Sequence, residues 1–133
     1  MSASPRVLRI LVVDDDDSIR KAIARFLRLD LEAVEVGEAA DAASCLQIVE
    51  GSKWDLVLLD ISLPDRSGLE VLRELRETGH SMPVVVVSAL PADQYRRPAL
   101  GAGATAFIQK ERVPEELRDI VSAAVQGPSA AGR

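Results

Sequence analysis

Five aspartates follow two apolar segments of the chain, and residues of this type could bind a cation or carry out a reaction. Asp14–Asp17 come after Ile10–Val13, and Asp60 comes after Leu56–Leu59. Carboxylates repel one another and burial disfavours their ionised form, so such a cluster beside buried strands is costly. Proteins accept that cost at sites that hold a cation or perform a reaction. The aspartates are therefore the first candidates for a functional site.

Two further polar residues occur where apolar segments end. Ser88 follows Val84–Val87, and Lys110 comes shortly after Ala106–Ile108. If these segments are parallel strands, their carboxyl ends meet at one edge of the sheet, where ligands bind. Each residue alone has a simpler explanation, such as a helix cap, a turn or a solvated amine. Those explanations are independent of one another, so together they account poorly for the convergence.

The chemistry of this set suits a metal ion and a phosphoryl group. Three carboxylates with no local arginine favour a hard divalent cation, Mg²⁺ or Mn²⁺, held by oxygens and waters. The cation would offset the repulsion and hold one phosphoryl oxygen, while a hydroxyl and an ammonium would take the others. One carboxylate could then attack phosphorus and form an acyl phosphate. The chain has no G-x-x-x-x-G-K-[ST] loop, so no nucleotide site is expected.

Apolar segments alternate with amphipathic ones along the whole chain. The expected strands are Val7–Val13, Val34–Val36, Leu56–Leu59, Val84–Val87 and Ala106–Ile108. Continuous apolar runs indicate parallel strands covered on both faces, whereas Glu35 between two valines indicates an edge strand. Alternation of strands and helices predicts a parallel sheet with right-handed crossovers and helices on both faces.

The helices are predicted from apolar residues that recur every three or four positions. Four of them contain Ile19–Leu27, Ala39–Val49, Leu69–Leu75 and Leu117–Val125. Asp16 or Asp17 is expected to cap the first helix. The remaining helix, Asp93–Leu100, contains Pro98, which removes a backbone hydrogen bond and clashes with the preceding turn. We therefore expect that helix to be short, kinked or shifted.

Composition excludes several classes of protein. With 133 residues, 47% hydrophobic and 28% charged, the chain is one globular domain. Its net charge of −5 argues against direct nucleic-acid binding by this segment. The single cysteine, Cys45, excludes an internal disulfide and fits a reducing compartment. No segment has the length of a membrane span or the apolar core of a signal peptide, so we expect a cytoplasmic location without membrane contact.

Over residues 7–126 the chain resembles the receiver domain of bacterial two-component response regulators. The resemblance rests on four segments, Val12–Asp15, Leu58–Gly68, Val86–Ala89 and Phe107–Lys110. Residues 69–72 are most similar to receivers that precede LuxR-type DNA-binding domains. The resemblance implies an α/β, flavodoxin-like (βα)5 three-layer sandwich with a parallel five-stranded sheet of order 2-1-3-4-5. Residues 1–6 and 127–133 are expected to be flexible ends, the second a linker to an effector domain.

The resemblance also implies roles for individual residues. Asp60 would accept a phosphoryl group from a histidine kinase, and Mg²⁺ would be held by Asp14, Asp15, Asp60 and the backbone carbonyl of Ser62. The phosphoryl oxygens would be bound by Ser88 and Lys110. The switch would consist of movement of Ser88 and inward rotation of the Phe107 ring. The domain would be a signalling switch rather than an enzyme.

Three features depart from the usual receiver pattern. Glu111 follows Lys110 where many receivers have proline, and Phe107 lacks a tyrosine hydroxyl. Pro98 falls in the face formed by the fourth helix, fifth strand and fifth helix, through which a homodimer would form on phosphorylation. In this family, the positions of Ser62 and Leu90 influence how long the phosphoryl group persists. Leu90 is apolar, and we expect it to slow attack by water.

Two other functions compete with a phosphorylated receiver. Asp14-x-Asp16 after an apolar strand also resembles the first motif of haloacid-dehalogenase-type phosphatases. That family needs a further acidic pair after its lysine, and we find no strand with such a pair after Lys110. The second alternative is a receiver-like docking module that works without phosphate. The intact acidic pair, acceptor, serine and lysine argue against it.

Overall fold

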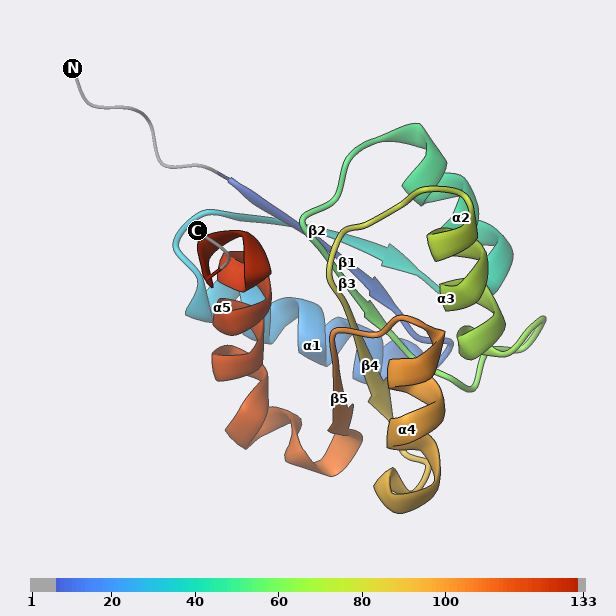
Figure 1. Cartoon of the computed structure of the whole chain (residues 1–133). Coiled ribbons are helices and arrows are strands. Elements are labelled where there is room, and N and C mark those ends of the chain that lie inside the picture. Colours follow the sequence, from blue (N-terminus) through green and yellow to red (C-terminus); the bar gives the residue numbers. More distant parts are fainter. Residues whose placement is uncertain (1–6, 132–133) are drawn as a thin grey trace.

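The five predicted strands form one parallel sheet in the order β2-β1-β3-β4-β5 (Figure 1). This is a computed structural model, and it describes residues 7–131. The strands are β1 (Leu8–Val13), β2 (Val34–Ala39), β3 (Leu56–Leu59), β4 (Val84–Ser88) and β5 (Ala106–Gln109). The helices are α1 (Asp17–Asp30), α2 (Ala42–Gly51), α3 (Gly68–Glu77), α4 (Ala92–Ala102) and α5 (Val113–Ala131), with a 3₁₀ turn at Lys110–Arg112. The predicted fold and strand order are confirmed.

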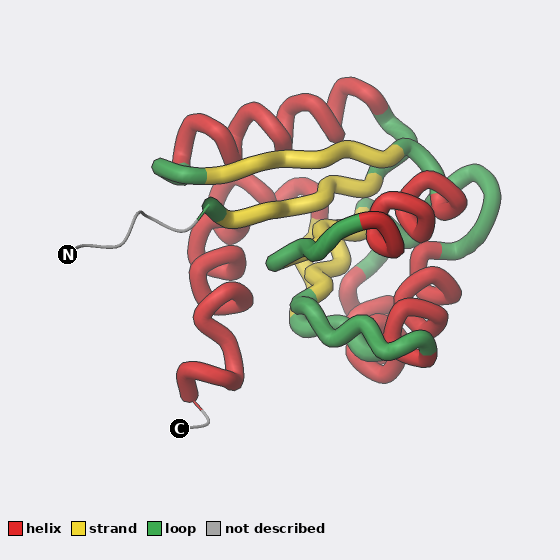
Figure 2. Tube along the Cα trace, turned by 90° about the horizontal axis from the view of Figure 1, so that it is seen from above, coloured by secondary structure: helices red, strands yellow, loops and turns green. Residues whose placement is uncertain are grey.

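Helices cover both faces of the sheet, which lies between them in Figure 2. Because strand side chains alternate between faces, Leu11 and Val13 pack toward α2, α3 and α4, while Ile10 and Val12 pack toward α1 and α5. Two apolar cores therefore sandwich the sheet. Burial on both faces explains why the central strands have nearly continuous apolar sequences.

The edge strand is β2, as the alternation around Glu35 predicts. It is longer than expected from its apolar residues alone. Its second half, Gly37–Ala39, pairs in register with Leu11–Val13 of β1. Backbone pairing with a buried neighbour has extended the strand beyond its hydrophobic segment.

Helix α4 runs through Pro98 and spans 11 residues, so of the expected effects of this proline, a short, kinked or shifted helix, the shortening is wrong. Proline removes the bond from its nitrogen to the carbonyl four residues earlier, which belongs to Gln94. Both Gln94 and Pro98 are exposed, so water can satisfy that carbonyl. The buried side of the helix, at Ala99 and Ala102, is unaffected.

Helix α5 continues to Ala131, beyond the expected boundary at Gln126. The φ that the proline ring imposes is compatible with a helix, and alanine is a strong helix former, so the sequence at positions 128, 130 and 131 permits this continuation. Residues 1–6 and 132–133, which we expected to be flexible, lie outside the described residues. No helix between residues 7 and 131 has the length and apolar character needed to span a membrane.

Candidate functional site

Three aspartates meet at the carboxyl ends of β1 and β3. The Asp60 amide donates to the Val13 carbonyl oxygen at 3.0 Å, which continues the pairing of these strands and sets Asp60 beside Asp14. Asp14 is 2% exposed and Asp60 3%, whereas Asp15 is exposed. One carboxylate oxygen from each of Asp14, Asp15 and Asp60 lies within 4.8 Å of the others, close enough to hold one metal ion. Oxygen ligands of this kind suit a hard divalent cation.

Lys110 joins the two buried carboxylates. Its Nζ lies 2.8 Å from Asp14 Oδ2 and 3.0 Å from Asp60 Oδ2. Burial disfavours the charged amine, but the hydrogen bonds to Asp14 and Asp60 outweigh it and raise the pKa of Lys110. The side chain is therefore a fixed ammonium group beside Asp60.

Asp60 is held in an environment that disfavours its charge. Burial raises the pKa of Asp60, and the Asp14 charge adds to this effect. Hydrogen bonds from Lys110 and from the Ser62 amide, which is 3.2 Å from Asp60 Oδ1, offset part of it. Positive charge brought near the carboxylate, or loss of its negative charge, would relieve the remaining cost.

The rest of the aspartate run shapes the loop after β1. Asp14 Oδ1 accepts from the Asp16 amide at 2.9 Å, and Asp16 Oδ1 accepts from the Ile19 amide at 3.0 Å. Asp16 is therefore the N-cap of α1, as predicted. This role also separates Asp16 from the phosphatase motif that Asp14-x-Asp16 resembles. In the described chain, the residues after Lys110 form a 3₁₀ turn and α5, and they provide no further strand for an acidic pair.

Arg20 was missed by sequence reasoning, and the expectation of no local arginine is wrong. Its Nη1 donates to the backbone oxygen of Asp14 at 2.8 Å, and its Nε donates to Glu38 at 2.9 Å. Its Nη2 also binds Asp17, and the pair Asp17–Arg20 at i,i+3 was the signal available in the sequence. Because Arg20 binds the Asp14 carbonyl rather than its carboxylate, it does not compete with a metal ion for the three clustered carboxylates.

The loop after Asp60 ends at Gly68, where the backbone leaves no space for a side chain. Its amide donates to the Ile61 oxygen at 2.7 Å, and a Cβ at this position would overlap the Asp60 carbonyl oxygen. Only a residue without a side chain permits this close approach. Asp65 fixes the same loop from outside, since its carboxylate accepts from the amides of Ala42 and Ala43 at the start of α2.

Ser88 ends β4 and Leu90 follows it, while Phe107 lies within β5 opposite Val86. Ser88 is fully buried, and its Oγ accepts from the Leu90 amide at 2.9 Å. Phe107, expected to turn inward on activation, is only 3% exposed in this structure. The Arg96 guanidinium lies over its ring, 5.5 Å from the centroid. The roles of Ser88, Leu90 and Phe107 in switching, and of the Ser62 carbonyl as a metal ligand, stay predictions.

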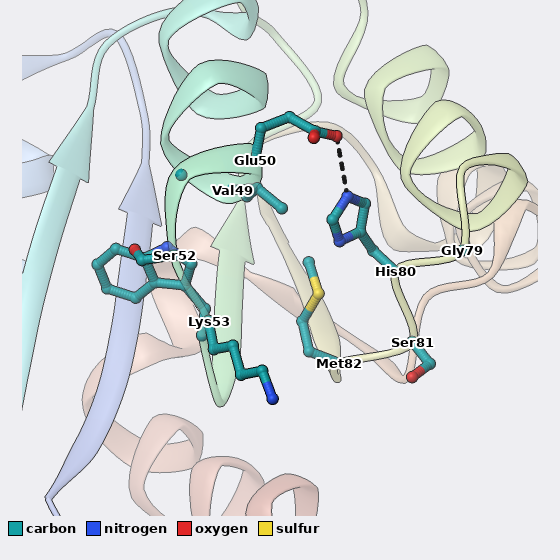
Figure 3. A pocket seen from close by; sticks show the side chains of 10 residues that line it. Val49, Glu50, Ser52, Lys53, Gly79, His80, Ser81 and Met82 are labelled. Carbon is teal, nitrogen blue, oxygen red and sulfur yellow. Dashed lines mark hydrogen bonds and ion pairs between the residues drawn. The ribbon is translucent and has the colours of Figure 1, made fainter.

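A separate depression of about 500 Å³ lies far from these residues in the fold, where α2 and α3 end (Figure 3). It is lined in part by Lys53, Trp54 and Met82. His80, the one histidine of the chain, points across it toward Glu50, with Nε2 3.2 Å from the carboxylate. None of the predicted phosphorylation residues lines this depression.

Comparison with known proteins identifies the family. A response regulator receiver domain model matches residues 10–122. The chain is 38% identical over 110 residues to the response regulator MprA of Mycobacterium sp. (strain KMS), a match covering 83% of this chain and 47% of that protein. The chain therefore spans about half the length of this curated relative.

Solved structures agree with the sequence relatives. A LuxR-family two-component response regulator from Aurantimonas sp. SI85-9A1 matches with a TM-score of 0.84 and 26% identity, over 96% of this chain and 88% of that one. Response regulator protein TrrA from Thermotoga maritima, in complex with Mg²⁺-BeF, matches with a TM-score of 0.78 and 31% identity, over 87% and 97%. The LuxR-family match agrees with the pattern noted after Gly68. Together with the aspartate cluster and Lys110, these matches show that the chain belongs to the response regulator receiver domain family of two-component systems.

Proposed function

We propose that this receiver is a phosphorylation-controlled switch in which Asp60 accepts a phosphoryl group from a histidine kinase. A carboxylate oxygen of Asp60 forms the new O–P bond, and the P–N bond to the kinase histidine breaks with its electron pair leaving on nitrogen. The observation that supports this most strongly is the ammonium of Lys110, fixed 3.0 Å from Asp60 Oδ2. It is placed to neutralise a phosphoryl oxygen on the carboxylate.

A divalent cation fits the same site. Asp14, Asp15, Asp60 and the backbone carbonyl of Ser62 would hold Mg²⁺, or Mn²⁺ in its place. When bound, the ion offsets the repulsion between the carboxylates and the incoming phosphoryl group. The relative TrrA, in complex with Mg²⁺-BeF, supports this choice of ion. Asp14 and Asp60 also keep Lys110 charged, so cation and ammonium face the phosphoryl group together.

Phosphorylation would change the surface formed by α4, β5 and α5. Ser88 would move toward the phosphoryl oxygens, and the ring of Phe107, over which Arg96 lies, would turn inward as Ser88 moves. The phosphoryl group shifts the population between two arrangements by its different contacts in each. A homodimer formed on phosphorylation and control of transcription through a linked DNA-binding domain complete the proposal, with the domain acting as a signalling module rather than an enzyme.

Acetyl phosphate with Mg²⁺ tests the phosphorylation step directly. Intact-mass measurement should find one added phosphoryl group on the wild type, none on Asp60→Asn, and one on the control Asp119→Asn, an exposed acid of α5. A chelator should abolish the modification. Absence of any modification on the folded wild type would favour the phosphate-independent docking module.

A further inference from the structure

One side chain from β5 holds the segment that joins β4 to α4. Gln109 Nε2 donates to the Ser88 carbonyl oxygen at 3.3 Å and to the Leu90 carbonyl oxygen at 2.7 Å. Gln109 Oε1 accepts from the Ala92 amide at 3.3 Å. Two carbonyls on one side and one amide on the other fix the orientation of the carboxamide. A single residue thus satisfies three backbone groups of the 88–92 segment.

The acceptor provided by Gln109 replaces a missing helix cap. The N-cap residue of α4 is Pro91, and it makes no side-chain cap hydrogen bond. An N-cap side chain normally accepts from one of the first amides of a helix. Here the oxygen that accepts from Ala92, the first residue of α4, comes from the neighbouring strand. The start of α4 is therefore tied to β5 rather than to its own preceding loop.

Gln109 lies between Ser88 and Lys110, the two residues proposed to bind the phosphoryl oxygens. It pairs with Ser88 in the register of β4 and β5, and Lys110, which contacts Asp60, is the next residue. Ser88 Oγ is itself bound to the Leu90 amide within this segment. Movement of Ser88 toward a phosphoryl group would have to stretch or break the bonds that Gln109 makes to the carbonyls of Ser88 and Leu90.

We propose that Gln109 is a positioning residue of the switch, which holds the 88–92 segment in its present arrangement and sets how readily that segment moves when Asp60 is phosphorylated. This inference rests on the proposed phosphorylation of Asp60. Gln109 touches neither the carboxylate cluster nor Lys110 Nζ through its carboxamide, and it acts through the backbone of Ser88 and Leu90. Its removal should therefore favour the arrangement that binds a phosphoryl group.

Gln109→Met tests the proposal because it removes all three hydrogen bonds with little change in length and no change in charge. Beryllofluoride with Mg²⁺ serves as the probe for the phosphorylated arrangement. The variant should bind the probe about tenfold more tightly than the wild type, since the moving segment no longer loses the hydrogen bonds made by Gln109. Gln94→Met, on the exposed face of α4, is the matched control and should bind as the wild type does.

Hydrogen exchange gives a second, local measurement. In the free protein the Ala92 amide should exchange about tenfold faster in Gln109→Met than in the wild type, while Val86 in the core of β4 keeps its rate. Equal or weaker probe binding, or equal acceleration at Ala92 and Val86, would show a merely structural role and overturn the proposal. Gln109→Leu repeats both measurements if the methionine variant does not fold, and failure of both variants to fold would overturn it too.

The proposed function fails separately from this inference. If the folded wild type binds no beryllofluoride and behaves as Asp60→Asn does, the phosphorylation of Asp60 is contradicted. If the wild type binds the probe, Asp60→Asn does not, and Gln109→Met matches the wild type, only the role of Gln109 is lost.

Discussion

At the scale of single residues, Gly68 shows how backbone packing dictates one amino-acid type. The first turn of α3 passes against the carbonyl of Asp60, and the glycine amide binds Ile61. The loop between Asp60 and Gly68 is thereby closed at both ends by backbone contacts. The glycine in this motif is a requirement of space rather than of unusual torsion angles.

Gly68→Ala should destabilise the domain by about 1–3 kcal/mol, because an added methyl group must displace the Asp60 backbone. Urea unfolding measures the change, and phosphorylation by acetyl phosphate should slow in the same variant. Gly101→Ala is the control, since a Cβ there meets no atom within 4 Å and alanine favours the interior of α4. Equal stability of Gly68→Ala and the wild type would contradict the steric explanation.

Leu90 is a second single residue with an expected effect, since in our proposal its apolar side chain slows the attack of water on the phosphoryl group. It is half-buried and packs against the core beneath α4. Leu90→Glu and Leu90→Asn should lose the phosphoryl group faster than the wild type, because a polar side chain can hold an attacking water. The decay of phosphorylated protein after removal of donor provides the measurement. Leu100→Asn, on the exposed surface of α4, should leave the decay unchanged. Equal decay in all variants would show that Leu90 does not influence the lifetime of the phosphoryl group.

At the scale of elements, Arg76 ties the ends of α3 and α4 to the start of β4. Its Nε and Nη2 donate to the Gly103 oxygen at 3.0 and 2.8 Å, and its Nη1 donates to the His80 and Met82 oxygens at 3.0 and 2.8 Å. Carbonyls at helix C-termini carry partial negative charge, which a guanidinium complements. A single planar group therefore satisfies three backbone acceptors, one after α4 and two in the connection between α3 and β4.

Arg76→Lys should cost about 1–3 kcal/mol of stability, because one ammonium group cannot reach all of these carbonyls. Chemical denaturation of the purified domain checks the value. Arg73→Lys, one turn earlier and exposed, should be nearly neutral. A neutral Arg76→Lys would mean that water replaces the guanidinium without loss.

Asp65 links two elements in a manner that depends on pH. Hydrogen bonds from the Ala42 and Ala43 amides lower the pKa of Asp65 in the folded protein. A lowered pKa stabilises the fold above the unfolded-state pKa, near 3.9 for aspartate, and that stabilisation is lost as pH falls through the folded value. The melting temperature of Asp65→Asn should therefore lie below that of the wild type at neutral pH, with the difference shrinking below about pH 4. Asp119→Asn controls for loss of a surface charge, and a pH-independent difference would refute the role of the Asp65 charge in binding the Ala42 and Ala43 amides.

Prediction from sequence succeeded where local pattern and geometry agree. The strands were predicted because apolar runs of strand length are buried on both faces. The meeting of the three aspartates with Lys110 was predicted because parallel strands end at one edge of the sheet. The length of β2, the course of α4 through Pro98 and the contacts of Arg20 and Gln109 were not found. Each of these depends on which element lies beside which and on whether a given face meets water, and a single sequence does not encode that locally.

At the scale of the whole molecule, Lys110 joins β1, β3 and the turn after β5 through two ion pairs. Lys110→Met should lower the stability of the domain by about 1–3 kcal/mol, because two buried carboxylates lose their counter-charge. Mg²⁺ should then raise the melting temperature of this variant more than that of the wild type. Lys21→Met, at an exposed ion pair with Glu38, is the control. An equal response to Mg²⁺ in the wild type and Lys110→Met would contradict the shared role of lysine and metal.

The bridge between Lys110, Asp14 and Asp60 has a consequence for how this domain could meet its metal. Because Lys110 already supplies a counter-charge to Asp14 and Asp60, we expect the domain to fold without magnesium. A metal ion would bind carboxylates that already contact the Lys110 ammonium group. Its affinity would therefore depend on competition with Lys110 as well as on its own ligands. Changes in magnesium concentration would then alter how fast the domain can be charged with phosphate, while the folded population stays constant. Through Lys110, folding would not depend on the magnesium concentration, whereas the response to a phosphodonor would.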